Sequence, residues 1–249
     1  MVKKIAIITG ASRGIGAATA TRLASDGYNI CVNYLTDAKA ADSVVETAKS
    51  HGVQAIAVQA DIALEADVER LFNTTDKELG SPYALINNAA ILFQQSRVID
   101  MNAERINKLL ATNVTGCFLC CKQAVARMST ARGGAGGVIV NVSSAASRIG
   151  SGGEYVDYAA SKGAVDTLTL GLATEVADEG IRVNCVRPGF IYTQMHASGG
   201  EPERVERVKG SVPLKRGGQP EEVAAAIAWL VSGESSYTTG SFIEVSGGR

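Results

Sequence analysis

The chain has 249 residues, of which 46% are apolar, and its 24 lysines and arginines nearly balance its 25 aspartates and glutamates. Such a length permits a large buried core without disulfides or metals, and the balanced charge argues against a generally basic surface for nucleic acid or membranes. Glycine is the unusual component, with 27 residues, while the 5 prolines and the apolar content exclude a collagen-like or disordered chain.

The first residues and the cysteines indicate the compartment. The first apolar run, residues 5–8, follows two lysines but stops at Thr9, which is too short for the core of a signal peptide. We find no apolar run close to the roughly 18 residues of a membrane-spanning helix. The 5 cysteines are odd in number and lack the spacing of a disulfide framework. We therefore expect a reduced, cytoplasmic protein that binds neither membranes nor nucleic acid.

Short β-branched runs alternate with longer segments of helical period along the chain. The expected strands are Lys4–Thr9, Asn29–Tyr34, Gln54–Gln59, Ala84–Asn87, Val138–Val142, Arg182–Val186 and Phe242–Val245. The expected helices are Ile15–Ser25, Ala38–Ser50, Glu65–Leu79, Ala103–Arg132, Tyr155–Asp178, Glu203–Lys209 and Pro220–Val231. This alternation predicts an α/β fold of the Rossmann type, a doubly wound parallel sheet of seven strands. No linker or repeat divides the chain, so we expect a single domain over residues 1–249.

Two segments depart from this pattern. Five residues at 133–137, four of them glycine, separate a helix from a strand and predict a turn. The segment 189–212 is long, polar and contains glycine. A loop of this length is often a lid over a ligand, and an ordinary surface loop is the alternative.

A glycine-rich loop follows the first strand and precedes a helix. Gly10 lets the chain turn sharply, Gly14 lets the backbone approach a phosphate, and Gly16 lets the helix pack closely on the strand. The helix N-terminus then offers free N–H groups and the positive end of the helix dipole. Because the strand, the loop and the helix occur in the required order, this segment predicts a dinucleotide-binding site.

A tyrosine and a lysine lie four residues apart at the start of a later helix. Tyr158 and Lys162 therefore project from one helical face. A nearby lysine cation favours phenolate and lowers the tyrosine pKa, as a general acid or base for a carbonyl or alcohol requires. The pair follows the fifth strand, at the sheet edge where ligands bind in such folds. Tyr155 lacks a cation four residues later and is not expected to react.

These motifs resemble the short-chain dehydrogenase/reductase family. The resemblance spans Thr9 to Gly248 and includes T-G-x-x-x-G-x-G at Thr9–Gly16, Asn87-Asn88-Ala89, Asn113, Ser144, the Tyr158/Lys162 pair and Pro188-Gly189. Bacterial 3-oxoacyl carrier-protein reductases and glucose dehydrogenases look most similar. The resemblance implies hydride transfer between a nicotinamide and a small carbonyl or secondary alcohol. A sugar or alcohol dehydrogenase working in the oxidative direction with NAD is the alternative, and a non-catalytic NADP(H)-binding regulator is a more distant one.

The resemblance also assigns the catalytic residues. Ser144 would position the substrate oxygen, Tyr158 would transfer the proton, and Lys162 would hold the cofactor ribose and tune Tyr158. Asn113 would bend its helix and hold a water linked to Lys162. Ser143 takes the serine's place if the register is shifted by one. Two departures from the family pattern stand out: an alanine at 90 where glycine is usual, and one extra residue between Ser144 and Tyr158.

The cofactor is expected to be NADP(H), with NAD(H) possible. No acidic residue ends the second strand at Asn33 or Tyr34, and Arg13 in the loop can pair with a 2′-phosphate, although Asp37 follows soon after. The resemblance implies that Asp61 contacts the adenine and that Ile191 and Thr193 hold the nicotinamide amide and a phosphate. The expected cofactor-binding residues are Gly10, Ser12, Arg13, Gly14, Ile15, Gly16, Asn33, Tyr34, Asp61, Ile62, Asn88, Ala89, Tyr158, Lys162, Pro188, Gly189, Ile191 and Thr193.

Other candidate sites are weaker. Cys117, Cys120 and Cys121 have too few histidine neighbours for zinc, and a buried helical stripe explains them better, so we expect no metal. The two histidines, His51 and His196, lie too far apart in sequence to suggest a catalytic triad. His196 remains a candidate for substrate contact in the 189–212 loop. The resemblance implies a homotetramer, with a dimer as the alternative.

Overall fold

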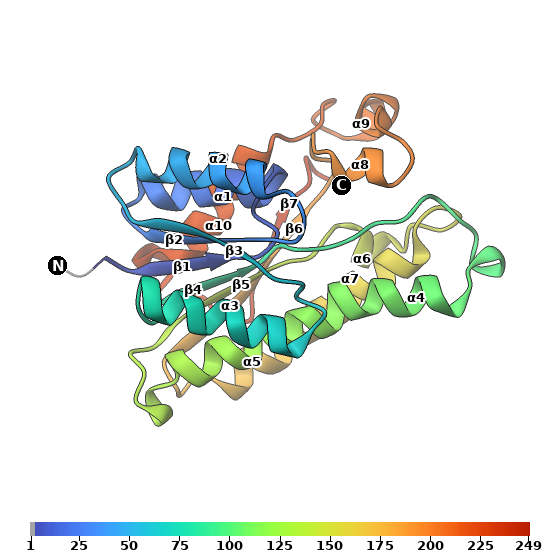
Figure 1. Cartoon of the computed structure of the whole chain (residues 1–249). Coiled ribbons are helices and arrows are strands. Elements are labelled where there is room, and N and C mark those ends of the chain that lie inside the picture. Colours follow the sequence, from blue (N-terminus) through green and yellow to red (C-terminus); the bar gives the residue numbers. More distant parts are fainter. Residues whose placement is uncertain (1–2) are drawn as a thin grey trace.

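The computed structural model describes residues 3–249 and contains one parallel sheet of seven strands. Its strand order is β3-β2-β1-β4-β5-β6-β7, so the chain winds outward in both directions from β1 (Figure 1). The strands are β1 (Ile5–Ile8), β2 (Asn29–Tyr34), β3 (Ala55–Gln59), β4 (Ala84–Asn87), β5 (Gly137–Val142), β6 (Ile181–Pro188) and β7 (Phe242–Val245). All seven expected strands and the doubly wound fold are confirmed.

Helices cover both faces of the sheet. Successive residues of each buried strand point to opposite faces, and both sets are mainly apolar, so each face needs a covering layer. One face carries α1 (Gly14–Ser25), α2 (Ala38–Lys49) and α10 (Pro220–Val231). The other carries α3 (Glu65–Glu78), α5 (Gly116–Met128) and α7 (Val156–Glu175). Thus Ile8 and Ile30 pack into the first core, whereas Ile7 and Cys31 pack into the second. The carboxyl ends of all strands meet at one edge.

The helix expected over Ala103–Arg132 is not uniform. It consists of α4 (Ala103–Leu110), a π-helical segment η2 (Ala111–Thr115) and α5, and it ends at Met128. Within the described residues, the continuous stretch Ala103–Met128 is long and apolar enough to cross a membrane by length and composition alone. Because α5 buries Cys117, Cys120 and Cys121 against the sheet, the stretch is placed as a helix of the core.

The segment after β6 differs from the irregular loop expected over 189–212. It contains α8 (Met195–Ser198), α9 (Arg204–Val208) and η4 (Lys209–Ser211), and the bridge between Ile191 and Gly218 closes its base. We call residues 189–218 the lid; it projects beyond the carboxyl edge of the sheet (Figure 1). A second short helix, α6 (Ala146–Ile149), follows β5 and was not expected either. The remaining short turns are η1 (Val98–Asp100), η3 (Thr130–Arg132) and η5 (Gly233–Ser235).

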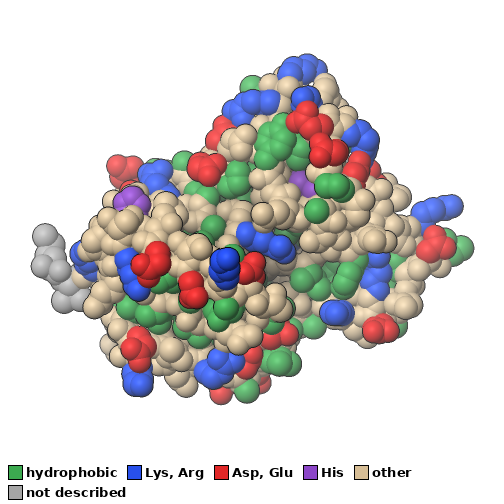
Figure 2. All heavy atoms as spheres, turned by 45° about the horizontal axis from the view of Figure 1, so that its top comes forward, with side chains coloured by type: hydrophobic (Ala, Val, Ile, Leu, Met, Phe, Trp, Pro, Cys, Tyr) green, Lys and Arg blue, Asp and Glu red, His purple; other side chains and the backbone are tan. Residues whose placement is uncertain are grey.

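Charged residues of both signs are mixed on the surface. On the face drawn in Figure 2, lysine and arginine side chains alternate with aspartate and glutamate side chains. This distribution agrees with the near-balanced totals of 24 basic and 25 acidic residues.

Candidate active site

The glycine-rich loop is tied to the end of β4 by a threonine. The Thr9 hydroxyl accepts hydrogen bonds from the backbone N–H groups of Asn88 and Ala89, each at 3.0 Å. The Asn88 amide donates to the carbonyl oxygens of Thr9 and Gly10, at 2.9 and 3.1 Å. These bonds explain why the Asn-Asn-Ala segment accompanies this loop. The Asn88 side chain and the backbone N–H groups of Asn88 and Ala89 fix the shape of the loop.

Two glycines of the loop occupy positions unsuited to other residues, Gly16 because it lacks space and Gly14 because its backbone is left-handed. A Cβ on Gly16 would lie 2.5 Å from Asn88 Nδ2 and 2.7 Å from the Gly10 oxygen. Gly14 has a φ of +57°, and a Cβ there would meet Thr193 of the lid at 3.4 Å. The loop is therefore a narrow cradle between β4 and the lid, as a phosphate-binding turn requires.

The N-terminus of α1 is open to an anion. Arg13 is the N-cap residue, makes no side-chain capping bond, and no acidic residue lies in the first turn. The first N–H groups and the positive end of the helix dipole thus point into the cradle without a protein partner among the described residues. This arrangement fits the pyrophosphate of a dinucleotide, which would be held by Gly14, Ile15 and Gly16.

The end of β2 carries no free acid. The Asn33 carboxamide is buried: it accepts from the Gly10 N–H at 3.1 Å and donates to the Val58 and Ala60 oxygens at 3.3 and 3.0 Å. Its side chain therefore orders the loop instead of facing a ligand. Asp37 caps α2 by accepting from the Ala40 N–H at 3.0 Å. One oxygen of the carboxylate considered as a ribose ligand is thus engaged in the helix cap.

Asp61 follows β3 and lies at the adenine side of the expected cofactor site. Its Oδ1 accepts from the Ala63 N–H at 2.9 Å, which leaves its second oxygen available. Ser12, Arg13 and Tyr34 lie at the same edge of the sheet, and Arg13 is exposed. An exposed guanidinium at this position has the geometry and charge for a phosphate monoester.

Ser144, Tyr158 and Lys162 come together beyond β5. Lys162 is buried, and its Nζ donates to the Val142 oxygen at 2.8 Å and lies 5.6 Å from the centre of the Tyr158 ring. Ser144 lies near the Tyr158 hydroxyl and lowers its pKa, and both residues line one cavity with Lys162. The neighbouring Ser143 instead donates its hydroxyl to the Lys162 carbonyl at 3.1 Å. The geometry therefore favours Ser144 over Ser143 as the reactive serine.

The titration of this group differs from the expectation for an isolated tyrosine–lysine pair. Burial raises the pKa of Tyr158 to about 12, and the hydrogen bond with Ser144 lowers it only in part. Burial also lowers the pKa of Lys162, against the opposing influence of Cys117, Cys185 and Asp166. Desolvation thus outweighs the attraction of the lysine cation, so the predicted decrease of the tyrosine pKa is wrong for the protein without a bound cofactor.

Asn113 occupies the π-helical segment and fixes the adjoining loop. It accepts from the Ile91 N–H at 2.8 Å, donates to the Ile91 oxygen at 3.0 Å and donates to Ser161 Oγ at 3.1 Å. A cavity of about 10 Å³ lies behind it. Its lining includes Thr9, Ile62, Asn87, Ala89, Asn113, Cys117 and Lys162. The cavity is about the size of a single water and is lined by polar groups that can hold one.

Ala90 fits without strain although the family pattern has glycine there. Among the described residues other than glycine, only Ser151 and Lys215 have a positive φ. The backbone at Ala90 is therefore accessible to any residue. Ser151, with a φ of 48°, lies instead in the segment between Ser144 and Tyr158, where the extra residue was noted.

A cavity of about 320 Å³ joins the expected catalytic and cofactor residues. Of the residues expected from sequence, those that line it are Ile15, Asn88, Ser144, Tyr158, Lys162, Pro188, Gly189, Ile191 and Thr193. The other walls come from the segment after β4, from α6 and from the lid. Tyr155 also lines the cavity, but its hydroxyl donates to the Gly199 oxygen at 3.2 Å. Its role is therefore to hold the lid.

The lid is held down by an ion-pair cluster that the sequence did not reveal. Arg204 is 6% exposed and lines the cavity. Its guanidinium pairs with Glu154 of the segment before α7 and with Glu201 at 3.1 Å, and it covers the Tyr155 ring at 4.8 Å. Arg204 keeps the pKa of Glu154 low. No motif marks the cluster, because Glu154 lies 50 residues before Arg204 and the two meet only when the lid folds over the edge.

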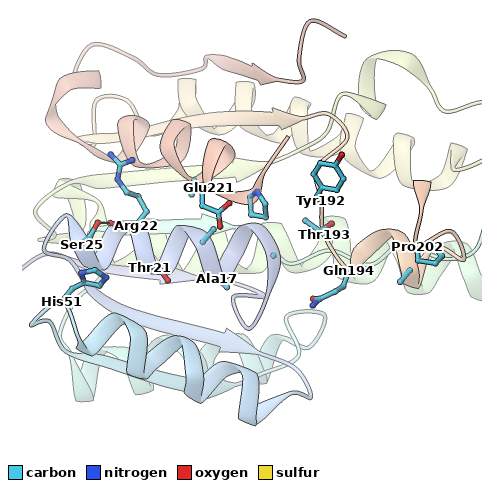
Figure 3. A pocket seen from close by; sticks show the side chains of 15 residues that line it. Ala17, Thr21, Arg22, Ser25, His51, Tyr192, Thr193, Gln194, Pro202 and Glu221 are labelled. Atoms are coloured by element: carbon cyan, nitrogen blue, oxygen red, sulfur yellow. Dashed lines mark hydrogen bonds between the residues drawn. The ribbon is translucent and has the colours of Figure 1, made fainter. Parts of the chain in front are cut away.

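A second hollow, of about 870 Å³, runs from the loop along α1 to His51 (Figure 3). Ala17 and Thr21 of α1 form one side of the hollow. Thr193 and Gln194 of the lid lie at the end opposite His51. It begins at Gly14 and so shares its mouth with the cradle. His51, at its far end, is exposed and remote from Tyr158, as expected for a residue without a catalytic role.

The cysteines form no metal site within residues 3–249. All five are buried and unpaired, and three of them lie on α5. Burial raises the pKa of Cys31 and of Cys185 to about 12. The interpretation of Cys117, Cys120 and Cys121 as residues of the core agrees with this structure.

Comparison with known proteins defines the class. Residues 10–249 match a family model described as enoyl-(acyl carrier protein) reductase. The chain is 60% identical to the oxidoreductase YgfF of Escherichia coli (strain K12), over 98% of this chain and 99% of that protein. It is 37% identical to glucose 1-dehydrogenase 2 of Bacillus subtilis (strain 168), over 98% and 94%. A solved short-chain dehydrogenase from Burkholderia cenocepacia J2315, in complex with NADP, superposes with a TM-score of 0.90 at 31% identity, over 99% and 98%.

The sheet, the glycine cradle and the cavity thus define a nucleotide-dependent oxidoreductase of the α/β class. The chain belongs to the short-chain dehydrogenase/reductase family.

Proposed function

We propose that this protein is an NADP(H)-dependent oxidoreductase that reduces a small carbonyl compound, or oxidises the corresponding secondary alcohol, as a single domain over residues 1–249. The observation that carries the proposal is the cavity of about 320 Å³, because Ser144, Tyr158 and Lys162 share it with Ile15, Ile191 and Thr193. In this proposal the proton-transferring groups share one cavity with the residues that would hold the cofactor. Its volume suits a small ligand.

Each residue has a defined task in the proposed reaction. A bound nicotinamide supplies the hydride for the carbonyl carbon. The Ser144 hydroxyl holds the substrate oxygen, and Tyr158 donates its phenolic proton to that oxygen. Tyr158 is protonated at neutral pH, so the proton that the reductive direction needs is present before the reaction. Lys162 holds the ribose, and the polar cavity between Asn113 and Lys162 gives a route for proton resupply.

The preference for NADP(H) rests on three observations. Asp37 is engaged as a helix cap, Asn33 faces the loop, and Arg13 is exposed at the cradle. Asn33 is uncharged, the Asp37 carboxylate is held at the N-terminus of α2 by its cap, and Arg13 attracts a 2′-phosphate. The Burkholderia relative was solved with NADP, which supports the same choice.

The test compares both cofactors over a panel of carbonyls and alcohols. We expect NADPH to be the better donor, and Arg13→Ala to raise the KM for NADPH roughly tenfold while leaving NADH turnover nearly unchanged, because only NADPH carries the extra phosphate. Arg132→Ala is the control, since Arg132 is exposed and precedes β5 at the opposite edge of the sheet. Equal kcat/KM values for NADPH in wild type and Arg13→Ala would contradict the assignment.

We also propose a cytoplasmic homotetramer, with the long helix α4–α5 at one subunit contact. Its outer face exposes Leu110 and Phe118, the latter to 51%. Such exposed apolar side chains, about two helical turns apart, suit helix pairing between copies. We expect Phe118→Glu to shift the mass measured by light scattering to a smaller species. Leu64→Glu, at an equally exposed apolar position before α3, should leave the mass unchanged; a wild-type monomer would refute the proposal.

A further inference from the structure

One arginine of the cavity wall has a role in none of the steps above. Arg249 follows β7 and lines the cavity of about 320 Å³ together with Ser144 and Tyr158. Its guanidinium carbon lies 4.8 Å from the centre of the Phe190 ring, and its Nη1 donates to Ser211 Oγ of the lid at 3.3 Å. Because the side chain is exposed and lines the cavity, a ligand in the cavity can reach it.

This guanidinium has no acidic partner in the protein. It forms no ion pair with an aspartate or glutamate side chain within residues 3–249. Of the carboxylates on neighbouring elements, Glu201 and Glu206 of the lid and Glu244 of β7 pair with other cations. The main-chain oxygen of Arg249 accepts from Ser246 Oγ at 2.8 Å, so the backbone here is held beside the end of β7. The side chain therefore keeps donors for an anion.

The charged side chains of the cavity wall are mainly cationic. They are Lys162, Arg204 and Arg249 against a single carboxylate, Glu154. Arg204 is matched, because it pairs with Glu154 and with Glu201. Lys162 is buried, and the proposed reaction uses it to hold the cofactor ribose. The charge of Arg249 is thus the one that neither a carboxylate of the protein nor the proposed ribose contact accounts for.

The histidine and the catalytic tyrosine of the wall do not change this balance. Burial raises the pKa of Tyr158 to about 12, so the phenol is neutral at neutral pH. Burial also lowers the pKa of His196, whose Nε2 lies 2.9 Å from the Ile191 oxygen, so this ring is neutral as well. A cavity with a surplus positive charge attracts an anionic ligand more strongly than a neutral one.

Arg249 lies at the lid and not at the glycine cradle. Its guanidinium shares the Phe190 ring with Arg204, whose guanidinium carbon lies 5.5 Å from the centre of that ring. The cradle meets the lid at a different residue, Thr193, which would lie 3.4 Å from a Cβ on Gly14. The cofactor phosphates belong at the cradle, so the anionic partner of Arg249 is expected on the substrate.

We propose that Arg249 binds an anionic oxygen group, a carboxylate or a phosphate monoester, that a small substrate carries besides its reacting carbonyl. The preferred substrates are then short keto acids or phosphorylated ketones, or the matching alcohols in the oxidative direction. In reduction, the carbonyl carbon gains the hydride of the reduced nicotinamide cofactor and its oxygen gains the Tyr158 proton. The anionic group is unchanged, and the products are the anionic alcohol and the oxidised cofactor. The inference rests on the proposed carbonyl reduction and adds its substrate class.

The test uses pairs of substrates that differ in the anionic group. Acetoacetate and levulinate are each compared with their methyl esters, and hydroxyacetone phosphate with hydroxyacetone, all with NADPH. The wild-type enzyme should favour the anion in at least one pair by roughly tenfold in kcat/KM, the value of one hydrogen bond to a charged group. The pair that shows the preference distinguishes a carboxylate from a phosphate. Added salt should reduce the preference, because it screens exposed charges.

Two substitutions of Arg249 and one control locate the effect. Arg249→Gln should remove the preference by lowering only the value for the anion, whereas Arg249→Lys keeps the charge and should retain part of it. Arg148→Gln is the matched control, because Arg148 is an exposed arginine of α6 that pairs with Glu244 at 3.0 Å and lies outside the cavity wall. It removes the same charge and should leave the preference unchanged. An equal loss in Arg249→Gln and Arg148→Gln would overturn the inference.

The KM for NADPH separates substrate binding from cofactor binding. Arg249→Gln should leave this KM unchanged, and a clear increase would assign the arginine to a cofactor phosphate and refute the inference. Should a variant fail to fold, the wild-type ratios decide alone, and no preference for the anion in any pair refutes the inference. Reduction of other carbonyls but of no anionic substrate would refute it and leave the proposed function intact, whereas no reduction of any carbonyl would refute both.

Discussion

Replacing Tyr158 by phenylalanine should reduce kcat by roughly 10²–10⁴-fold, because the substrate oxygen then has no positioned proton donor. The change removes one hydroxyl from a tyrosine that shares its cavity with Ser144 and lies beside Lys162. The ring remains, so the cavity keeps its shape. NADPH should still bind, and its fluorescence titration should give a Kd close to that of the wild type.

Tyr155→Phe is the matched control for this experiment. Tyr155 lines the same cavity three residues earlier, but its hydroxyl donates to the Gly199 oxygen of the lid. Its loss should weaken one lid contact and reduce kcat/KM by less than about tenfold. If Tyr158→Phe retained wild-type turnover, or if the two variants lost activity equally, Tyr158 would not be the proton donor.

Gly16→Ala should damage both the fold and cofactor binding. Alanine normally stabilises a helix relative to glycine by about 1 kcal/mol. Here the new methyl group would lie 2.5 Å from Asn88 Nδ2 and 2.7 Å from the Gly10 oxygen, so the cradle must open. We expect the free energy of unfolding to fall by about 1–3 kcal/mol. Because the cradle positions the phosphates, kcat/KM for NADPH should fall by roughly 10²-fold.

Gly171→Ala tests the same substitution in a helix where space is free. Gly171 is an exposed residue of α7, and no heavy atom lies within 4 Å of a Cβ placed there. This variant should be more stable by about 0.5–1 kcal/mol and should keep its activity. Chemical denaturation followed by circular dichroism measures both free energies. A stabilised Gly16→Ala variant with normal NADPH kinetics would show that the cradle is looser than its contacts indicate.

The sheet was predictable because each strand is a short apolar run bounded by turn residues. The expected and observed bounds are identical for strands such as Ala84–Asn87. Both faces of a parallel sheet are buried, so the ends of the apolar run mark the ends of the strand. The cradle was predictable for a similar reason: Gly10, Gly14 and Gly16 follow a strand and precede a helix. These signals are local, and a short window of sequence contains them.

The remaining parts of the site depend on contacts between distant segments. Arg204 meets Glu154 only when the lid folds over the segment before α7, 50 residues earlier in the chain. The titration of Tyr158 was also not predictable, because its environment is set by burial and not by the neighbouring lysine alone. Asn33 was expected beside a ligand, but its side chain turns inward. Its carboxamide hydrogen-bonds with the backbone of the glycine-rich loop and of the segment around the end of β3, which are distant from it in sequence.

The placement of the cysteines also affects how this protein responds to oxidants. A thiol reacts as its thiolate, and all five thiols here are buried, with the pKa of Cys31 and of Cys185 raised to about 12. The folded chain therefore offers little to peroxide or alkylating reagents, although three cysteines lie on the helix next to Lys162. Chemical modification must wait until part of the structure opens, so the rate of thiol labelling would report how often the core around α5 is exposed.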